Sequence, residues 1–258
     1  MTDLLVTTEP GKPPINLSIG EPRHGTPNFV KTVLADTWQE FGRYPPIRGT
    51  ATWRKAVTNW LEKRYSLDGT IDPDKHVLPL CGTREGLFYA ALAAHTWIQK
   101  TDTPTLTLLP NPFYQVYASS SSITGAEIGY YEAPASNGFL PKFESIPKKW
   151  LNQTQVFYIA SPSNPQGAVL TLDHWKKLIE LSLEHNFMIF ADECYSEIYR
   201  NTPPPGILEA SSQLGTGFKN MITFHSLSKR SNLPGLRSGF VAGDPDFLKD
   251  WTGFRNVA

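Results

Sequence analysis

The chain has 258 residues, of which 40% are hydrophobic and 12% aromatic, so it can bury a sizeable core in one large domain or two small ones. Its 24 basic and 24 acidic side chains cancel, which argues against nucleic acid or an anionic membrane as a partner. The sequence has neither a membrane-span pattern nor a secretory signal pattern. Cys81 and Cys194 are isolated, which predicts reduced thiols, a cytoplasmic location and no metal site.

The N-terminal part predicts two helices joined by a proline-fixed loop. The motif INLSIGEP comes first, and its Gly20 permits a close backbone approach. A helix is expected over residues 28–41, followed by the loop RYPPIRGT, which carries Tyr44. Thr50 is a good N-cap for a second helix over residues 52–65. The tryptophans of that helix recur at helical spacing, so we expect them to pack against a core.

From residue 77 to residue 243, short apolar runs typical of strands alternate with helical patterns. Strands are expected over 77–80, 104–109, 127–131, 155–160, 187–191, 221–224 and 239–242. Helices are expected from Thr83 to about Lys100 and over residues 171–185. This alternation predicts an α/β fold in which a mostly parallel sheet is covered by helices on both faces.

Polar side chains follow the ends of the expected strands. They are Thr83, Tyr114, Asn164, Asp192, Tyr195, Ser226, Lys229 and Arg237. Because the carboxyl ends of parallel strands share one edge of a sheet, these side chains can converge there. Lys229 is expected on a short loop between two strands, after the run Ser-Leu-Ser.

Each motif also has an ordinary interpretation. A Ser-x-Ser-Lys run taken alone is more often a surface turn. The helix start at Gly82 and Thr83 favours an anion, yet many such junctions bind nothing. Tyr114 can stack on a flat ring or simply pack. The ordered set is more specific than any member, because its chemistry matches the separate parts of pyridoxal 5'-phosphate.

The chain resembles the class I/II aminotransferase family of fold-type I pyridoxal-phosphate enzymes. The resemblance runs from about Asn16 to the end of the chain and rests on INLSIGEP, RYPPIRGT, VLPLCGTREGLFYA, NPFYQVY, NGFLPKF, SPSNPQGAV and DECYSEIY. Within the family, these motifs are most similar to those of bacterial N-succinyldiaminopimelate aminotransferases. The resemblance implies a cofactor-binding large domain over 46–258 and an N-terminal segment, 1–45, that contributes to a small domain and to dimer contacts. It also implies that the C-terminal part of the small domain, with an arginine for the substrate carboxylate, is missing from this chain.

The resemblance implies a role for each matching residue. The expected catalytic residues are Lys229, as the Schiff-base lysine and proton carrier, Asp192, as the partner of the pyridine nitrogen, and Tyr195, on the ring oxygen. The expected cofactor contacts are Gly82, Thr83, Arg84, Tyr114, Asn164, Asp192, Tyr195, Ser226, Ser228, Lys229 and Arg237, with Tyr44 reaching the phosphate of the neighbouring subunit. Gly20 and Asn164 are expected near the substrate. Gln166 departs from the family's usual threonine, with little expected effect.

The resemblance implies transamination by a cytoplasmic homodimer with shared active sites. The expected donor is glutamate and the expected acceptor is N-succinyl-2-amino-6-oxopimelate, on the path to diaminopimelate and lysine. Two alternatives remain open. One is another enzyme on the same scaffold, an aromatic, alanine or kynurenine aminotransferase or a carbon–sulfur lyase. The other is a truncated, non-catalytic protein of this fold.

Overall fold

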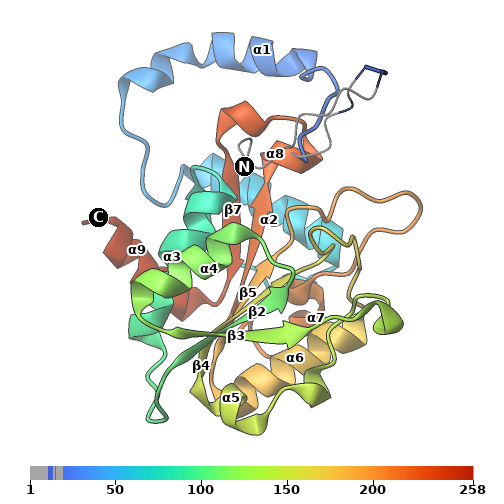
Figure 1. Cartoon of the computed structure of the whole chain (residues 1–258). Coiled ribbons are helices and arrows are strands. Elements are labelled where there is room, and N and C mark those ends of the chain that lie inside the picture. The colour runs from blue at the N-terminus through green and yellow to red at the C-terminus, as the bar shows by residue number, and fades with distance from the viewer. Residues whose placement is uncertain (1–10, 14, 16–19, 258) are drawn as a thin grey trace.

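The computed structural model describes all residues except 1–10, 14, 16–19 and 258 (Figure 1). In this described part a seven-stranded sheet runs in the order β1-β7-β6-β5-β4-β2-β3. The strands are β1 (Val77–Leu80), β2 (Leu106–Asn111), β3 (Glu127–Glu132), β4 (Thr154–Ala160), β5 (Met188–Asp192), β6 (Met221–Ser226) and β7 (Gly239–Gly243). Their bounds agree with the predicted strands within two residues. β7 pairs antiparallel with β1 and β6, and the other pairs are parallel, which confirms the mostly parallel α/β fold.

Helices cover both faces of the sheet (Figure 1). The helices of the described residues are α1 (Asn28–Asp36), α2 (Ala51–Tyr65), α3 (Thr83–Trp97), α4 (Gln115–Thr124), α5 (Lys148–Gln153), α6 (Leu172–His185), α7 (Ile207–Leu214), α8 (Leu227–Arg230) and α9 (Pro245–Arg255), with short 3-10 turns such as η2 (Trp38–Gly42). Helices α3, α4 and α9 pack on one face, and α2, α5, α6 and α7 pack on the other. None of the helices in the described ranges is both long and apolar enough to cross a bilayer.

The two faces of the sheet carry separate cores, because side chains alternate along each strand. On β5, Met188 and Phe190 enter the core under α3, α4 and α9. Ile189 and Ala191 enter the core under α2, α6 and α7. The alternation continues past the end of the strand, so Asp192 and the following residue, Glu193, lie on opposite faces.

The predicted cap of α2 is confirmed, since the Thr50 hydroxyl accepts a hydrogen bond from the backbone N–H of Trp53 at 3.2 Å. Thr171, which was expected inside the next predicted helix, is instead the N-cap of α6 and accepts from the N–H of His174. Trp53 and Trp60 of α2 pack against the core, as their spacing predicted. A side-chain cap of this kind stabilises a helix by about 1 kcal/mol.

The prediction of one long helix over residues 28–41 was wrong. The α-helix α1 ends at Asp36 and is followed by the 3-10 turn η2. Its apolar side chains do not enter a core, since Phe29 is 68% exposed and Phe41 is 74% exposed. Figure 1 shows α1 standing apart from the layers that cover the sheet.

The predicted loop around Lys229 is a helical turn, so that expectation was also wrong. The Ser226 hydroxyl accepts from the N–H of Ser228 at 3.1 Å and caps α8. The N–H of Leu227 donates to the carbonyl of Ser238 at 3.0 Å, which ties α8 to the start of β7. Lys229 therefore projects from a fixed turn, which limits the positions that its amine can reach.

Candidate active site

One edge of the sheet gathers most of the predicted site residues. The parallel strands end there, and antiparallel β7 begins there, with Gly239 paired to Ser226. Arg237, just before β7, therefore lies at the same edge as Lys229, just after β6. We call this the site edge. It corresponds to the carboxyl ends of the strands, where open α/β sheets bind their ligands.

Asp192 is the buried carboxylate of the site edge, with only 7% of its surface exposed. Its Oδ2 accepts a hydrogen bond from the Tyr117 hydroxyl at 2.7 Å, and its Oδ1 accepts from the N–H of Cys194 at 3.2 Å. Both donors are neutral, and no described Lys, Arg or His forms an ion pair with Asp192. The carboxylate is thus fixed in orientation while its charge stays available to a cation.

Tyr195 and Asn164 both line a groove of about 600 Å³. Tyr195 is half-buried, and burial, followed by the nearby Asp192 carboxylate, raises the pKa of its phenol. A phenol that stays protonated can donate a hydrogen bond to a ligand oxygen. Asn164, on the loop after β4, can donate from its amide to the same groove. The groove has the volume of a small-molecule site, but neither Asp192 nor Lys229 is among its lining residues.

The N-terminus of α3 forms a basic cup with Arg237. Gly82 has a φ of +102°, which side-chain-bearing residues rarely adopt, and the Arg237 guanidinium lies where a Cβ would be. No side chain caps α3, which leaves its first N–H groups free for an anion. Arg237 also pairs with Glu85 at 3.2 Å, and the Cys194 thiol donates to the Thr83 hydroxyl at 3.2 Å.

Lys229 reaches back to the N-terminal segment. Its Nζ donates a hydrogen bond to the carbonyl of Gly20, so the structure places these two predicted residues together. Asn232, on the same loop, donates to the carbonyl of Gly25 at 2.9 Å. Gly20 and Gly25 therefore lie beside Lys229 and Asn232.

Tyr114 and Arg84 lie together, but Tyr44 does not join them. The Nε of Arg84 donates to the Tyr114 hydroxyl at 2.8 Å, and its guanidinium lies 5.8 Å from the centre of the tyrosine ring. Ser228 uses its N–H to cap α8. Tyr44 is fully exposed and is not brought to the site edge by contacts within the described residues.

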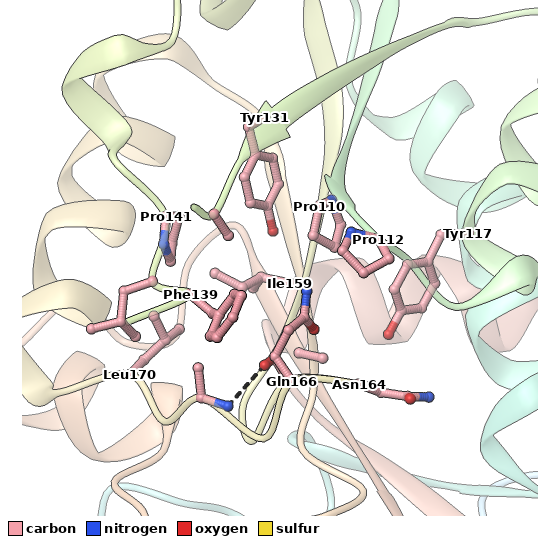
Figure 2. A pocket seen from close by; sticks show the side chains of 15 residues that line it. Pro110, Pro112, Tyr117, Tyr131, Phe139, Pro141, Ile159, Asn164, Gln166 and Leu170 are labelled. Carbon is pink, nitrogen blue, oxygen red and sulfur yellow. Dashed lines mark hydrogen bonds between the residues drawn. The ribbon is translucent and has the colours of Figure 1, made fainter. Parts of the chain in front are cut away.

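Gln166 and Asn164 both line a small cavity of about 30 Å³ (Figure 2). Its Oε1 is buried and has no hydrogen-bond partner among the described residues. Tyr117 borders the same cavity from the other side (Figure 2). A water molecule would fit this volume and could satisfy Oε1.

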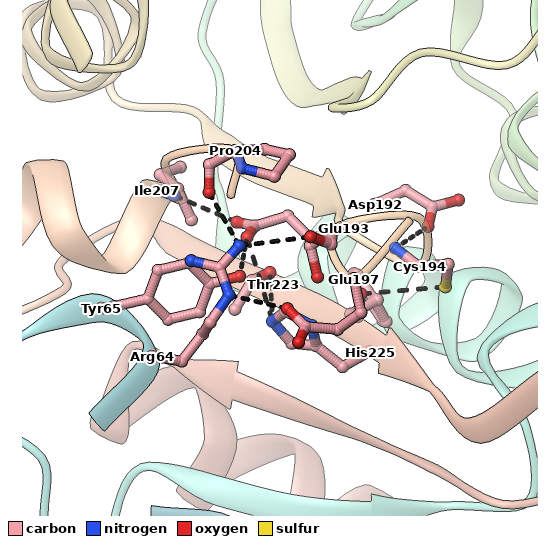
Figure 3. Close-up of polar contacts among 12 residues, drawn as sticks. Arg64, Tyr65, Asp192, Glu193, Cys194, Glu197, Pro204, Ile207, Thr223 and His225 are labelled. Atoms are coloured by element: carbon pink, nitrogen blue, oxygen red, sulfur yellow. Dashed lines mark hydrogen bonds and ion pairs between the residues drawn. The ribbon is translucent and has the colours of Figure 1, made fainter. Parts of the chain in front are cut away.

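A second buried carboxyl, Glu193, lies on the opposite face from Asp192. Its Oε2 accepts from the Tyr65 hydroxyl at 2.7 Å, and its Oε1 accepts from the N–H of Ile207 at 3.0 Å. His225 lies 4.0 Å from Oε2. We call Glu193, Tyr65, Ile207 and His225 the Glu193 cluster, and Figure 3 shows the Asp192 side chain turned away from it.

Burial sets the protonation states of this cluster. It raises the pKa of Glu193 to about 7. Burial, with the charges of Arg230 and Arg64, lowers the pKa of His225 to about 3. Sequence reasoning missed the Glu193 cluster and also missed Tyr117. Only the position of Tyr117, three residues after Tyr114 at a helix start, offered a signal for the latter.

The residues of the site edge fit the chemistry of pyridoxal 5'-phosphate. One end offers the basic cup at Gly82 and Arg237, which suits a phosphate. The other end offers the unpaired Asp192 carboxylate, which suits a protonated ring nitrogen. The same edge carries the primary amine of Lys229, which can condense with an aldehyde.

Comparison with known proteins agrees with this chemistry. Residues 12–256 match the family model "Aminotransferase class I and II". The chain is 36% identical over 249 residues to an LL-diaminopimelate aminotransferase of Dehalococcoides mccartyi, covering 95% of this chain and 61% of that protein. The chain thus spans less than two thirds of the length of the curated relatives it matches.

Solved structures share the fold. An aminotransferase from Neisseria meningitidis superposes with a TM-score of 0.89 at 40% identity, covering 98% of this chain and 63% of that one. A probable N-succinyldiaminopimelate aminotransferase from Thermus thermophilus superposes with a TM-score of 0.81 at 24% identity, covering 94% of this chain and 63% of that one, and shows likeness of fold alone. The chain belongs to the class I and II aminotransferase family, whose members depend on pyridoxal 5'-phosphate.

Proposed function

We propose that the protein transfers amino groups with bound pyridoxal 5'-phosphate, and that Lys229 is the residue that carries the cofactor. The observation that supports this most is the placement of one primary amine, Lys229 Nζ, on a capped turn at the same edge as the unpaired Asp192 carboxylate. When bound, the cofactor supplies an electron sink for charge that develops at the substrate α-carbon.

The residues around the cofactor divide the remaining work. Lys229 Nζ, once free, moves the proton at the substrate α-carbon as general base and then as general acid. Asp192 keeps a proton on the ring nitrogen, because its carboxylate stabilises a cation there. Tyr195 and Asn164 would donate hydrogen bonds to the ring oxygen, and Tyr114 would stack on the ring. Gly82, Thr83, Ser226 and Arg237 would hold the phosphate, with Arg84 and Ser228 in support.

The proposed substrates belong to diaminopimelate and lysine biosynthesis, with glutamate as amino donor. The motif resemblance supports an N-succinylated acceptor. The named curated relatives, at 30–36% identity, favour a second candidate, diaminopimelate chemistry without the succinyl group. Assays with the N-succinylated acceptor and with diaminopimelate itself decide between the two candidates. If the protein turned over aromatic amino acids but neither of these compounds, both candidates would be excluded.

We further propose a cytoplasmic homodimer with shared sites, in which residues 46–258 form the large domain and 1–45 contribute to a small domain and dimer contacts. The exposed apolar face of α1, with Phe29 and Val33, supports a covering partner. In such a dimer, Tyr44 would reach the phosphate of the neighbouring subunit. Light scattering of the purified chain tests the mass, and a monomer would remove this proposal.

The decisive experiment is the visible spectrum of the full chain with pyridoxal 5'-phosphate. We expect a yellow complex that borohydride bleaches irreversibly, with the label on Lys229. The Lys229→Ala variant should stay colourless, whereas Lys219→Ala, at a lysine outside the site edge, should behave like the wild type. A wild type that stays colourless with excess cofactor contradicts the proposed function.

A further inference from the structure

We propose that Tyr117 is a positioning residue for the cofactor. Its hydroxyl would hold the Asp192 carboxylate in the orientation that faces the ring nitrogen. This inference rests on the proposed function. The geometry that points to it is the 2.7 Å hydrogen bond from the Tyr117 hydroxyl to Asp192 Oδ2, made between two buried side chains.

The tyrosine has little freedom to do anything else. Its ring stacks on Tyr158 with 4.6 Å between ring centres and 15° between planes, and a second ring, Tyr114, meets its edge at 5.7 Å. Tyr158 is itself held, since its hydroxyl donates to the carbonyl of Leu87 at 2.9 Å. A stacked, fully buried ring loses no further side-chain entropy when its hydroxyl meets the carboxylate, so the bond is preorganised.

The hydroxyl also remains a neutral donor. Burial, followed by the charge of Asp192, raises the pKa of the Tyr117 phenol well above its usual value. The second partner of the carboxylate, the N–H of Cys194, is also neutral. Two neutral donors fix the plane of the carboxylate without cancelling its charge, which is what a partner for a cationic ring nitrogen requires.

Tyr158 offers a matched control for Tyr117. Its ring belongs to the same stack, and its hydroxyl also makes buried hydrogen bonds, but with Leu87 and Ser120 rather than with Asp192. Tyr117→Phe and Tyr158→Phe each remove one buried hydroxyl and keep the aromatic packing. Only the first alters the surroundings of the carboxylate.

The test measures the affinity of the full chain for pyridoxal 5'-phosphate and the pH titration of its visible band. Tyr117→Phe should weaken cofactor binding about 10-fold, the effect of one lost hydrogen bond to a charged group. The midpoint of the spectral titration should shift as well. Tyr158→Phe should change neither measurement. In an Asp192→Asn background, Tyr117→Phe should weaken cofactor binding by less than about twofold further, since Tyr117 and Asp192 act as one unit.

Three outcomes overturn the inference. The affinity and spectrum of Tyr117→Phe could match those of Tyr158→Phe. The full loss of cofactor affinity caused by Tyr117→Phe could also persist in the Asp192→Asn background, which would show that the effect comes from packing alone. A wild type that forms no coloured complex removes the proposed function and this inference with it, whereas a coloured wild type with an unaffected Tyr117→Phe removes this inference alone.

Discussion

Asp192 and Glu193 are neighbours in the chain, both are buried carboxyls, and they serve opposite faces of the sheet. Asp192 has two neutral donors and lies at the site edge. Glu193 accepts from Tyr65 and from the N–H of Ile207, and so links α2 and the start of α7 to the end of β5. Asp192 keeps a charge available to a ligand, whereas the hydrogen bonds of Glu193 stabilise the fold. Strand alternation alone separates the two roles.

The largest expected effect comes from changing Asp192, the carboxyl of this pair that lies at the site edge. Asp192→Asn keeps the shape of the side chain but removes the charge that would hold a proton on the ring nitrogen. We expect cofactor-dependent turnover to fall about 100-fold or more, by analogy with other lost electrostatic partners. The thermal midpoint should move by less than about 3 °C, because the asparagine Oδ1 can still accept from the N–H of Cys194 and its Nδ2 can donate to the Tyr117 oxygen. Steady-state kinetics and calorimetry on one preparation measure both.

Glu193→Ala is the matched change on the other face. It leaves the Tyr65 hydroxyl and the N–H of Ile207 buried without a partner, which should cost about 3 kcal/mol of stability. Turnover per folded molecule should be far less affected than in Asp192→Asn. If Glu193→Ala proved the milder of the two for stability, the assignment of Glu193 to the fold would be wrong.

The next effect is the pH dependence of stability that Glu193 and His225 produce. Burial raises the pKa of Glu193 from 4.5 to about 7, so its stabilising contribution is complete below pH 4.5 and is lost as the pH rises through 7. The size of that loss is on the order of 3 kcal/mol. Burial lowers the pKa of His225 from 6.5 to about 3, so its contribution is complete above pH 6.5 and is lost as the pH falls toward 3.

Between pH 4.5 and 6.5 the two slopes oppose each other. The stability of Glu193→Gln should therefore rise with pH across this window more steeply than that of the wild type, since only His225 then titrates. His225→Gln should show the opposite trend. Urea unfolding at several pH values measures each difference from the wild type, and two parallel profiles would contradict the assigned direction of both pKa shifts.

The site edge could largely be predicted from the sequence because it follows from local patterns. Each strand shows as an apolar run, and Asp192 and Lys229 follow such runs directly, so sheet topology brings them to one edge. The short helix at Lys229 was missed because its cap, Ser226, resembles the end of a strand until the chain turns.

The partners of the two carboxyls could not be predicted, because they depend on packing between distant segments. Tyr65 is 128 residues from Glu193, and Tyr117 is 75 residues from Asp192. The helix that carries Tyr117, α4, is rich in serine, which has weak helix propensity, and it is stabilised by packing against α3. No pattern within the sequence fixes the rotation of that helix.

The smallest expected effect tests whether α8 also separates a side chain of the site edge from a side chain that stabilises the fold on the opposite face. Lys229 faces the site edge, whereas its neighbour Arg230 lies 4.1 Å from the centre of the Trp60 ring, on the side of the Glu193 cluster. Arg230→Met keeps an apolar stem over the ring and removes the cation, so we expect a loss of about 1 kcal/mol with the cofactor band unchanged. Lys229→Met should abolish the band and leave stability nearly the same. Urea unfolding and visible spectra of both variants make the comparison. A loss of colour in Arg230→Met at full folding would show that the two faces are coupled through α8, which carries Lys229 and Arg230 to opposite sides.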